Sequence, residues 1–505
     1  SPARCFGRTL GETVGKSASL VPATKTGEGT MATDGCVDGA DTAWVLLSFV
    51  LVLVMFPGLA LFEAGLLPAK DSLSILAQIL VGVTVLSVMW DLFGYSLVFG
   101  PDRGGIVGAL DHVFLEGVPY NKCTSFAPTI PAAAFAMFQM LFAAISPLLM
   151  TGSFAGRFRF WPWLAFTVLW ELLVYYPVAH WVWGGGFLQR RGVIDFAGGI
   201  VVHATSGAGA LVTATMLGRR ENFELHENGE FPPSNLPLAV TGTGLLFIGW
   251  FGFNAGSALQ SGALATSTVM STQIGGCVSA VTWLVVAAIS SGGYPPGVVA
   301  VSNGGIAGLA GITPASGYID NRGTLALGVI IGLATYGGVV VLKKRARIDD
   351  ALDVSIVHGL SGIIGTIATG FLATRTAHPG LAHQGLLYGG GSYLLRAQLE
   401  GAAICFTYSL VMTAGLLWVI NKVWMHTTGR GVRVSVESER LGLDMTEHRE
   451  TAYHELEAPV AEEHKAMLPN HYGDPQVTAR RRSSWLPTDV DIADDVNAAQ
   501  PLINS

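Results

Sequence analysis

The sequence predicts an all-α integral membrane protein with about eleven membrane-spanning helices. Three observations predict this class: the 505-residue chain is 50% hydrophobic, it is only 13% charged, and its apolar residues gather in long runs. Soluble domains carry roughly 25% charged residues, so most of this surface cannot face water. The 64 glycines fit the same class, because small residues let helices approach closely within lipid. The composition therefore argues against a large glycine-rich soluble enzyme.

A spanning helix needs about 20 mostly apolar residues, and the sequence offers roughly eleven such runs. They are Trp44–Leu67, Leu73–Gly100, Ala132–Met150, Leu164–Trp183, Phe196–Leu217, Leu238–Ala258, Ala265–Ala288, Val298–Ile312, Thr324–Leu342, Val354–Leu372 and Leu399–Trp424. Val298–Ile312 is the shortest. The runs place a transmembrane domain at residues 41–424. It follows a polar segment at 1–40 that does not resemble a signal peptide, and precedes a tail at 425–505 expected to be disordered after about residue 459.

An odd number of spans places the two ends of the chain on opposite sides of the membrane. Loops after odd-numbered spans hold slightly more Lys and Arg than the alternate loops, and Lys422, Arg430 and Arg433 follow the last span. By the positive-inside rule, we expect the N-terminal segment 1–40 to be extracellular and the tail cytosolic. The chain is thus expected to be a multi-pass protein of the plasma membrane.

The five cysteines have no metal-ligand spacing, and no motif for a metal, a cofactor or nucleic acid is evident. Cys277 and Cys405 lie in apolar runs and are expected to be packing residues. Cys36 and Cys123 both fall on the expected outer side, which leaves a disulfide between them open.

Two histidines follow acidic residues at matching places in the chain. Asp195 opens the fifth span, with His203 eight residues on; Asp353 opens the tenth, with His358 five residues on. An acid at a helix start faces the positive end of the helix dipole. The recurrence predicts two inverted five-helix halves plus a final helix, with a transport site near the midplane where the halves meet. The alternative for each histidine is a hydrogen bond that only joins two helices.

Several longer motifs carry a resemblance to a known family. They are DFAGGIVVHATSGAGAL at Asp195–Leu211, AHWVWGGG at Ala179–Gly186, GWFGFNAGS at Gly249–Ser257, ITPASGYI at Ile312–Ile319 and DDALDVSIVHG at Asp349–Gly359. From about Trp44 to Tyr453 the chain resembles the ammonium transporter (Amt/Mep/Rh) family, and its Amt/Mep branch in particular. The resemblance implies the ammonium-transporter fold, a homotrimer in the lipid bilayer with one pore per subunit, and transport of ammonium or ammonia, with methylammonium as an analogue.

The resemblance also implies roles for individual residues. Trp183 and Ser257 match an outer vestibule site that recruits ammonium through a π face and a hydroxyl acceptor. Phe142 and Phe253 match a stacked pair that closes the vestibule, and Asp195 an acid that shapes the vestibule without binding substrate. The plainer alternatives are an interfacial tryptophan and two packing phenylalanines.

The physics of an apolar pore predicts how such a protein works. Stripping water from ammonium in an apolar pore is very costly, whereas neutral ammonia can cross. We therefore expect capture of ammonium outside, deprotonation near the vestibule, and passage of ammonia past His203 and His358. Neutral imidazoles can hydrogen-bond ammonia and relay a proton by tautomer exchange. Whether the proton travels with the ammonia stays open.

Three acids depart from the family pattern: Asp91, Glu171 and Glu63. They could pair with a neighbouring helix, face the trimer interface or bear on the pore, and a structural role is the expectation. The tail segment Arg433–Tyr453 resembles a family segment that contacts the neighbouring subunit. In it, Thr446 matches a threonine phosphorylated in plant relatives, so a kinase or another cytosolic regulator is an expected partner. The alternative is an ordinary tail threonine.

Three rival functions remain at this stage. An Rh-type gas channel is disfavoured by Trp183 and Ser257, because that branch lacks the high-affinity cation site. An ammonium sensor would use the same vestibule, although no signalling domain follows Trp424. An enzyme is disfavoured because no nucleophile–base set, metal cluster or phosphate loop is evident.

Overall fold

The computed structural model describes residues 35–226 and 231–453. Within them, ten segments are long and apolar enough to cross a membrane, and an eleventh apolar helix of 15 residues is shorter. The ten are Gly39–Leu66, Ala69–Phe99, Ala132–Phe154, Phe160–Arg190, Gly199–Leu217, Leu236–Gly256, Ala263–Ser290, Asn321–Ala346, Ser355–Leu372 and Tyr393–Thr428, and the shorter helix is Val298–Ile312. The all-α membrane class predicted from the sequence is confirmed.

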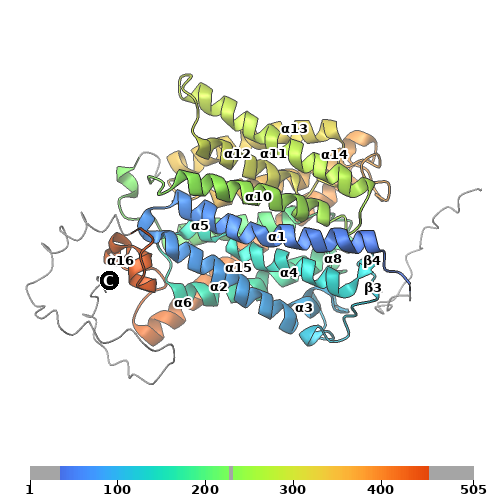
Figure 1. The fold of residues 1–505 in the computed structure, drawn as a ribbon, viewed down its shortest axis with the longest axis horizontal. Helices are drawn as coiled ribbons and strands as arrows, with labels where there is room; N and C mark the ends of the chain where they lie inside the picture. The colour runs from blue at the N-terminus through green and yellow to red at the C-terminus, as the bar shows by residue number, and fades with distance from the viewer. Residues whose placement is uncertain (1–34, 227–230, 454–505) are drawn as a thin grey trace, which may run out of the picture.

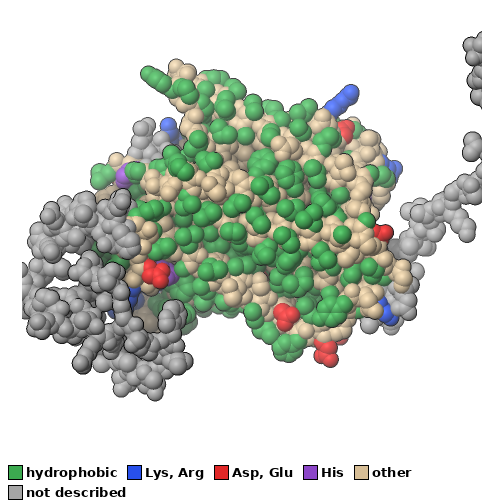
Figure 2. Space-filling view, viewed as in Figure 1, with side chains coloured by type: hydrophobic (Ala, Val, Ile, Leu, Met, Phe, Trp, Pro, Cys, Tyr) green, Lys and Arg blue, Asp and Glu red, His purple; other side chains and the backbone are tan. Residues whose placement is uncertain are grey.

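The α-helices follow the chain in order. They are α1 Gly39–Leu66, α2 Ser72–Met89, α3 Tyr95–Phe99, α4 Ala132–Leu148, α5 Thr151–Phe154, α6 Phe160–Trp170, α7 Tyr176–Val182, α8 Phe187–Arg190, α9 Thr205–Leu217, α10 Leu236–Gly256, α11 Ala263–Ser290, α12 Val298–Ile312, α13 Asn321–Val340, α14 Ser361–Leu372, α15 Tyr393–Thr428 and α16 Val436–Leu441. The long helices lie side by side (Figure 1). On the face drawn in Figure 2, hydrophobic side chains cover the middle, and the charged ones lie toward its edges.

Helices α1 and α10 pack closely because glycines line their contact. A Cβ added to Gly65 would lie 2.5 Å from the backbone nitrogen of Ala239, and one added to Gly58 would lie 3.0 Å from that of Leu246. Glycine at these positions lets two backbones touch within lipid, where close packing holds helices together.

Several spanning segments contain π-helical turns, which hydropathy does not predict. Trp90–Gly94 separates α2 from α3, and Glu171–Tyr175 separates α6 from α7. Gly199–Ala204 precedes α9, and Ser355–Leu360 precedes α14. The last two carry His203 and His358. Turns of this type are frequent at functional sites.

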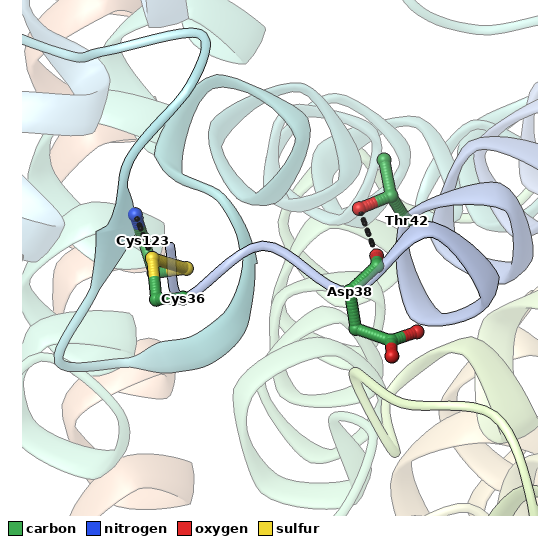
Figure 3. Close-up of a disulfide and its surroundings, with 4 residues drawn as sticks. All are labelled: Cys36, Asp38, Thr42 and Cys123. Carbon is green, nitrogen blue, oxygen red and sulfur yellow. Dashed lines mark hydrogen bonds between the residues drawn. A yellow bond between two sulfur atoms is a disulfide. The ribbon is translucent and has the colours of Figure 1, made fainter. Parts of the chain in front are cut away.

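Two short strand pairs lie in the loop between α3 and α4, at the end of the bundle where α1 begins (Figure 1). They are β1 Asp102–Arg103 with β2 Val107–Gly108, and β3 Cys123–Thr124 with β4 Ala127–Pro131. Cys36 and Cys123 form a disulfide (Figure 3), with their Cα atoms 6.2 Å apart. The Asp38 backbone N–H also donates to the carbonyl of Thr129 (2.8 Å). The disulfide left open by the sequence is therefore present, and it fastens the start of α1 to this loop.

The tail docks at the opposite end of the bundle, where α16 lies in Figure 1. The backbone of Arg433 bridges that of Phe158, and a final π-helical turn covers Asp444–His448. The Asp444 carboxylate accepts the N–H groups of Leu73 (3.0 Å) and Ser74 (2.7 Å), which caps the start of α2. Helix α15 ends at Thr428, four residues beyond the predicted edge of the transmembrane domain. The expected disorder after residue 459, and most of the polar segment 1–40, lie outside the described residues.

Candidate functional site

Each histidine turn begins beneath a buried aspartate that caps it. The Asp195 carboxylate accepts four backbone N–H groups, from residues 198 to 201, at 2.7–3.1 Å. Gly198, in this cap, has φ +108°, a conformation that glycine adopts without strain. The Asp350 carboxylate accepts the N–H of Val354 (3.1 Å) and both the N–H (2.7 Å) and the hydroxyl (2.6 Å) of Ser355. Both carboxylates therefore fix the start of a histidine-bearing helix.

Asp353, which was expected to open the helix that carries His358, does not cap that helix; Asp350 does. Asp350 precedes His358 by eight residues, the same interval that separates Asp195 from His203. Asp353 instead has φ +59° and pairs with Lys343, whose Nζ lies 3.0 Å from its Oδ2. The eight-residue spacing was present in the sequence and would have identified the correct residue.

Glycines bring the two histidine helices together. A Cβ added to Gly359 would lie 3.1 Å from the Cα of Gly207. A Cβ added to Gly362 would lie 3.0 Å from the Cβ of His203 and 2.6 Å from the carbonyl oxygen of Gly199. The segment after His358 thus packs directly against the turn that carries His203.

His203 and His358 meet in the interior of the molecule. Their Nδ1 atoms are 3.2 Å apart, and their rings are 5.2 Å apart at 24°. The side chains are buried, with residue exposures of 1% and 7%. The Nε2 atom of His203 forms no hydrogen bond with any described residue. The predicted meeting of one imidazole from each half is therefore present in the structure.

A narrow cavity of about 20 Å³ adjoins the two imidazoles. Its lining is apolar apart from the histidines. The lining residues are Met55, Leu59, Phe62, Ile145, Leu149, Val202, His203, Leu246, Trp250, Phe253, Ile306 and His358. A cavity that holds one water needs roughly 10–15 Å³ on this measure, so the space suits a single small molecule. Its walls offer polar contacts from the imidazoles and little else.

The four residues expected at the vestibule also lie together. The rings of Phe142 and Phe253 stack, with centroids 4.2 Å apart. Trp183 meets Phe142 edge-on at 6.1 Å, and its indole N–H donates to the carbonyl of Asp195 (2.9 Å). The hydroxyl of Ser257 donates to the carbonyl of Phe253 (2.8 Å), which leaves its lone pairs free to accept. Trp183 and Ser257 are partly exposed, whereas the two phenylalanines are buried.

Trp250 belongs to this site although it was not singled out in the sequence. Its ring stacks on His203 with centroids 5.5 Å apart, and its indole N–H donates to the hydroxyl of Thr313 (3.0 Å). The signal was available, because Trp250 lies one helical turn before Phe253 and therefore on the same face of α10.

The three unexpected acids occupy different surroundings. Asp91 is exposed on the π-helical turn after α2. Glu171 is fully buried; neither oxygen forms a hydrogen bond within the described residues, although the Tyr176 hydroxyl is a neighbour. Glu63 is 2% exposed, and its Oε2 accepts the hydroxyl of Thr151 (2.7 Å).

Thr446 lies in the docked tail rather than in the site. Its side chain is exposed, and its hydroxyl donates to the carbonyl of Gly442 (2.9 Å). The residues around it hold the tail in place: Asp444 caps α2, and Glu447 accepts the backbone N–H of Phe160 (3.0 Å). In the part of the chain that the structure describes, no group of three or more His, Cys, Asp or Glu side chains could hold a metal ion.

Comparison with known proteins assigns the chain. Residues 43–453 match the model of the Ammonium Transporter Family. Ammonium transporter 1 of Dictyostelium discoideum is 53% identical over 436 residues, covering 86% of this chain and 92% of the relative. An ammonium transporter of Aquifex aeolicus is 40% identical over 425 residues, covering 84% and 95%.

Solved structures agree with this assignment. The crystal structure of Saccharomyces cerevisiae Mep2 aligns with a TM-score of 0.73 at 31% identity, covering 80% of this chain and 89% of that one. A structure titled Sensor Amt Protein aligns with a TM-score of 0.72 at 28% identity, covering 81% and 98%. The eleven apolar helices and the family match over most of the sequence therefore place this chain in the ammonium transporter family, as a membrane transporter rather than an enzyme.

Proposed function

We propose that this transporter captures ammonium at Trp183 and Ser257, deprotonates it behind the Phe142–Phe253 pair, and conducts ammonia past His203 and His358. The single observation that carries the proposal is the imidazole pair, with Nδ1 atoms 3.2 Å apart, beside an apolar cavity of about 20 Å³. An ion would lose its hydration there without replacement, whereas a neutral base can pass.

The outer part of the site supports cation capture. Trp183 presents a partly exposed ring, and cations are attracted to aromatic faces. Ser257 supports it with an acceptor oxygen, because its own proton is directed to the Phe253 carbonyl. The carboxylate oxygens of Asp195 already accept backbone N–H groups, which favours an electrostatic role over direct binding of substrate. Phe142 contacts Trp183, and its stacking partner Phe253 lines the cavity, which supports a position of the pair between the two.

The inner part of the site supports selectivity for a proton-bearing substrate. A neutral imidazole offers one donor and one acceptor, so two in series can hydrogen-bond ammonia and exchange a proton through their facing Nδ1 atoms. Potassium has no proton to give up and no neutral form, so it gains nothing from this arrangement. The closed packing of the cavity walls excludes a hydrated ion of either kind.

The proposal extends to the location of the transporter, its orientation in the membrane and its partners. We place it in the plasma membrane with the N-terminal segment outside and the tail in the cytosol. The Cys36–Cys123 disulfide favours that orientation, because disulfides persist in oxidising compartments. A homotrimer with one pore per subunit, and a cytosolic kinase or other regulator acting at Thr446, complete the proposal.

Uptake of labelled methylammonium by cells that lack their own ammonium carriers tests this function. His203→Ala and His358→Ala should each lower uptake by roughly tenfold or more, or let potassium compete, since positioned proton-transfer groups contribute about 10²–10⁴-fold to reactions. His426→Ala is the matched control, because His426 is exposed near the end of α15. Normal uptake and selectivity in both pore variants would contradict the mechanism, and a wild-type protein that binds methylammonium without taking it up would be a sensor.

A further inference from the structure

Glu63 lies on the face of α1 that lines the cavity. Met55, Leu59 and Phe62 all line it, and Glu63 follows Leu59 by four residues and Met55 by eight. Residues at this spacing share one face of a helix. Glu63 is therefore the next side chain along the cavity-lining face, toward the end of α1 that faces the docked tail. Figure 1 shows the short helix α5 beside that end.

The surroundings of Glu63 fix the position of its side chain but supply no basic partner for it within the described residues. The Thr151 hydroxyl donates to its Oε2 (2.7 Å), and a Cβ on Gly152 would lie 2.9 Å from its Oε1. Among the described residues, the nearby charge that acts on it is the carboxylate of Asp350, which has the same sign. No ion pair to Glu63 forms within those residues. A lasting negative charge would be costly at a site that is 2% exposed, so the resting group is a carboxylic acid.

A buried acid beyond the imidazoles has a chemical use that a packing residue does not. Ammonia that leaves the cavity must regain a proton to become ammonium. The proton removed from ammonium in the vestibule must also leave the imidazole pair if the pair is to work again. An acid held by the Thr151 hydroxyl and the Gly152 backbone N–H can give up its proton, remain briefly as a carboxylate, and take up another.

We infer that Glu63 is the proton-transfer site at the inner end of the pathway. In the first step its O–H bond breaks and an N–H bond forms on ammonia, so that ammonium leaves toward the tail side and the carboxylate stays behind, bonded to Thr151. In the second step the carboxylate takes the proton that reaches it through the conduit from the imidazole pair. One ammonium enters and one leaves, and each cycle moves one positive charge. This inference rests on the proposed function and makes it electrogenic.

The charge carried per substrate tests this inference. Protein in liposomes is given methylammonium, and tracer uptake and transport current are recorded on the same preparation. Glu63→Gln cannot take up a proton and should lower the charge moved per methylammonium by roughly tenfold or more, in line with the loss of a positioned proton-transfer group. Uptake itself should continue at a lower rate, because the neutral base can still leave. Glu63→Asp, which keeps an acid, should retain part of the current.

Glu171→Gln is the matched control, because it removes a buried membrane acid from the turn Glu171–Tyr175, which contributes no residue to the cavity lining. It should leave the ratio of current to uptake unchanged. A readout without transport is the infrared band of a protonated carboxyl that shifts in heavy water; Glu63→Gln should remove one such band even where transport is weak. A Glu63→Gln ratio equal to wild type, or uptake without current in the wild type, overturns the inference. Absence of wild-type uptake would overturn the proposed function instead.

Discussion

Replacing Gly362 with alanine should separate the two imidazoles without dismantling the fold. The added Cβ would lie 2.6 Å from the carbonyl oxygen of Gly199, so the turn that carries His203 has to shift. It would also lie 3.0 Å from the Cβ of His203, while carbon atoms pack best at about 3.5–4.0 Å. His203 must therefore move about 0.5 Å, the difference between 3.0 and 3.5 Å. Gly362 follows the turn that carries His358 on the same continuous segment, so the added carbon pushes the turn that carries His203 away from that segment. The Nδ1–Nδ1 distance would grow from 3.2 Å to about 3.7 Å, beyond hydrogen-bonding range.

Gly362→Ala should lower both the stability of the fold and the rate of transport. Overpacking of this kind destabilises by about 1–3 kcal/mol, which should lower the melting temperature in detergent without preventing folding. Misplacement of reacting groups by 1 Å can cost about 10²-fold, so methylammonium uptake per folded molecule should fall by roughly tenfold.

Two other glycines give a graded series for the same assay. Gly359→Ala meets Gly207 at 3.1 Å and should have a smaller effect. Gly415→Ala has nothing within 4 Å of the added carbon and should behave as wild type. Normal uptake by folded Gly362→Ala protein would refute the claim that transport depends on this spacing of the imidazoles.

Three further predictions concern the two ends of the bundle. Cys36→Ser should lower the melting temperature but leave uptake per folded molecule unchanged. A disulfide that closes an 87-residue separation stabilises the fold by at most about 4.6 kcal/mol through chain entropy. The effect here should be smaller, because the spanning helices already restrict much of that loop. Burial raises the pKa of Asp444 to about 6, so tail docking should strengthen as the pH falls from 7 to 5, and Asp444→Asn should remove that part of the pH dependence in hydrogen exchange of the tail amides. Thr446→Asp places a charge between Asp444 and Glu447, and should loosen the tail and reduce uptake, whereas Thr428→Asp should do neither.

Much of the fold could be predicted because a membrane imposes a strong local rule. Each span must satisfy its own backbone hydrogen bonds within about 20 apolar residues, so hydropathy alone located the ten spanning segments of the described residues and the shorter helix Val298–Ile312. The short helices α5, α8 and α16 were not predicted. The π-helical turns were not predicted. The turn at Glu171–Tyr175 lies inside an apolar run whose hydropathy is continuous. Such a turn depends on side chains from other helices, and a local pattern contains no information about them.

The residues of the site that lie in recognisable motifs were predicted, whereas those defined only by packing were not. His203 and His358 were identified, and the structure brings them together. Asp353 was assigned to His358 because it directly precedes the apolar run that begins at Val354, yet the carboxylate that caps the helix is that of Asp350. Glu63 and Glu171 looked alike in the sequence, as acids within apolar segments. Only packing separates them, because one shares the face of α1 that lines the cavity and the other does not.

The two capping aspartates have a consequence for turnover. Both carboxylate oxygens of Asp195 accept backbone N–H groups, so this acid lends negative potential to its neighbourhood but has little capacity left to coordinate a cation. A free carboxylate at the same depth would hold a monovalent cation too tightly and become a trap. Permeation demands attraction that is strong enough for entry and weak enough for release. A carboxylate that is already hydrogen-bonded to the protein's own backbone can attract a cation without binding it tightly.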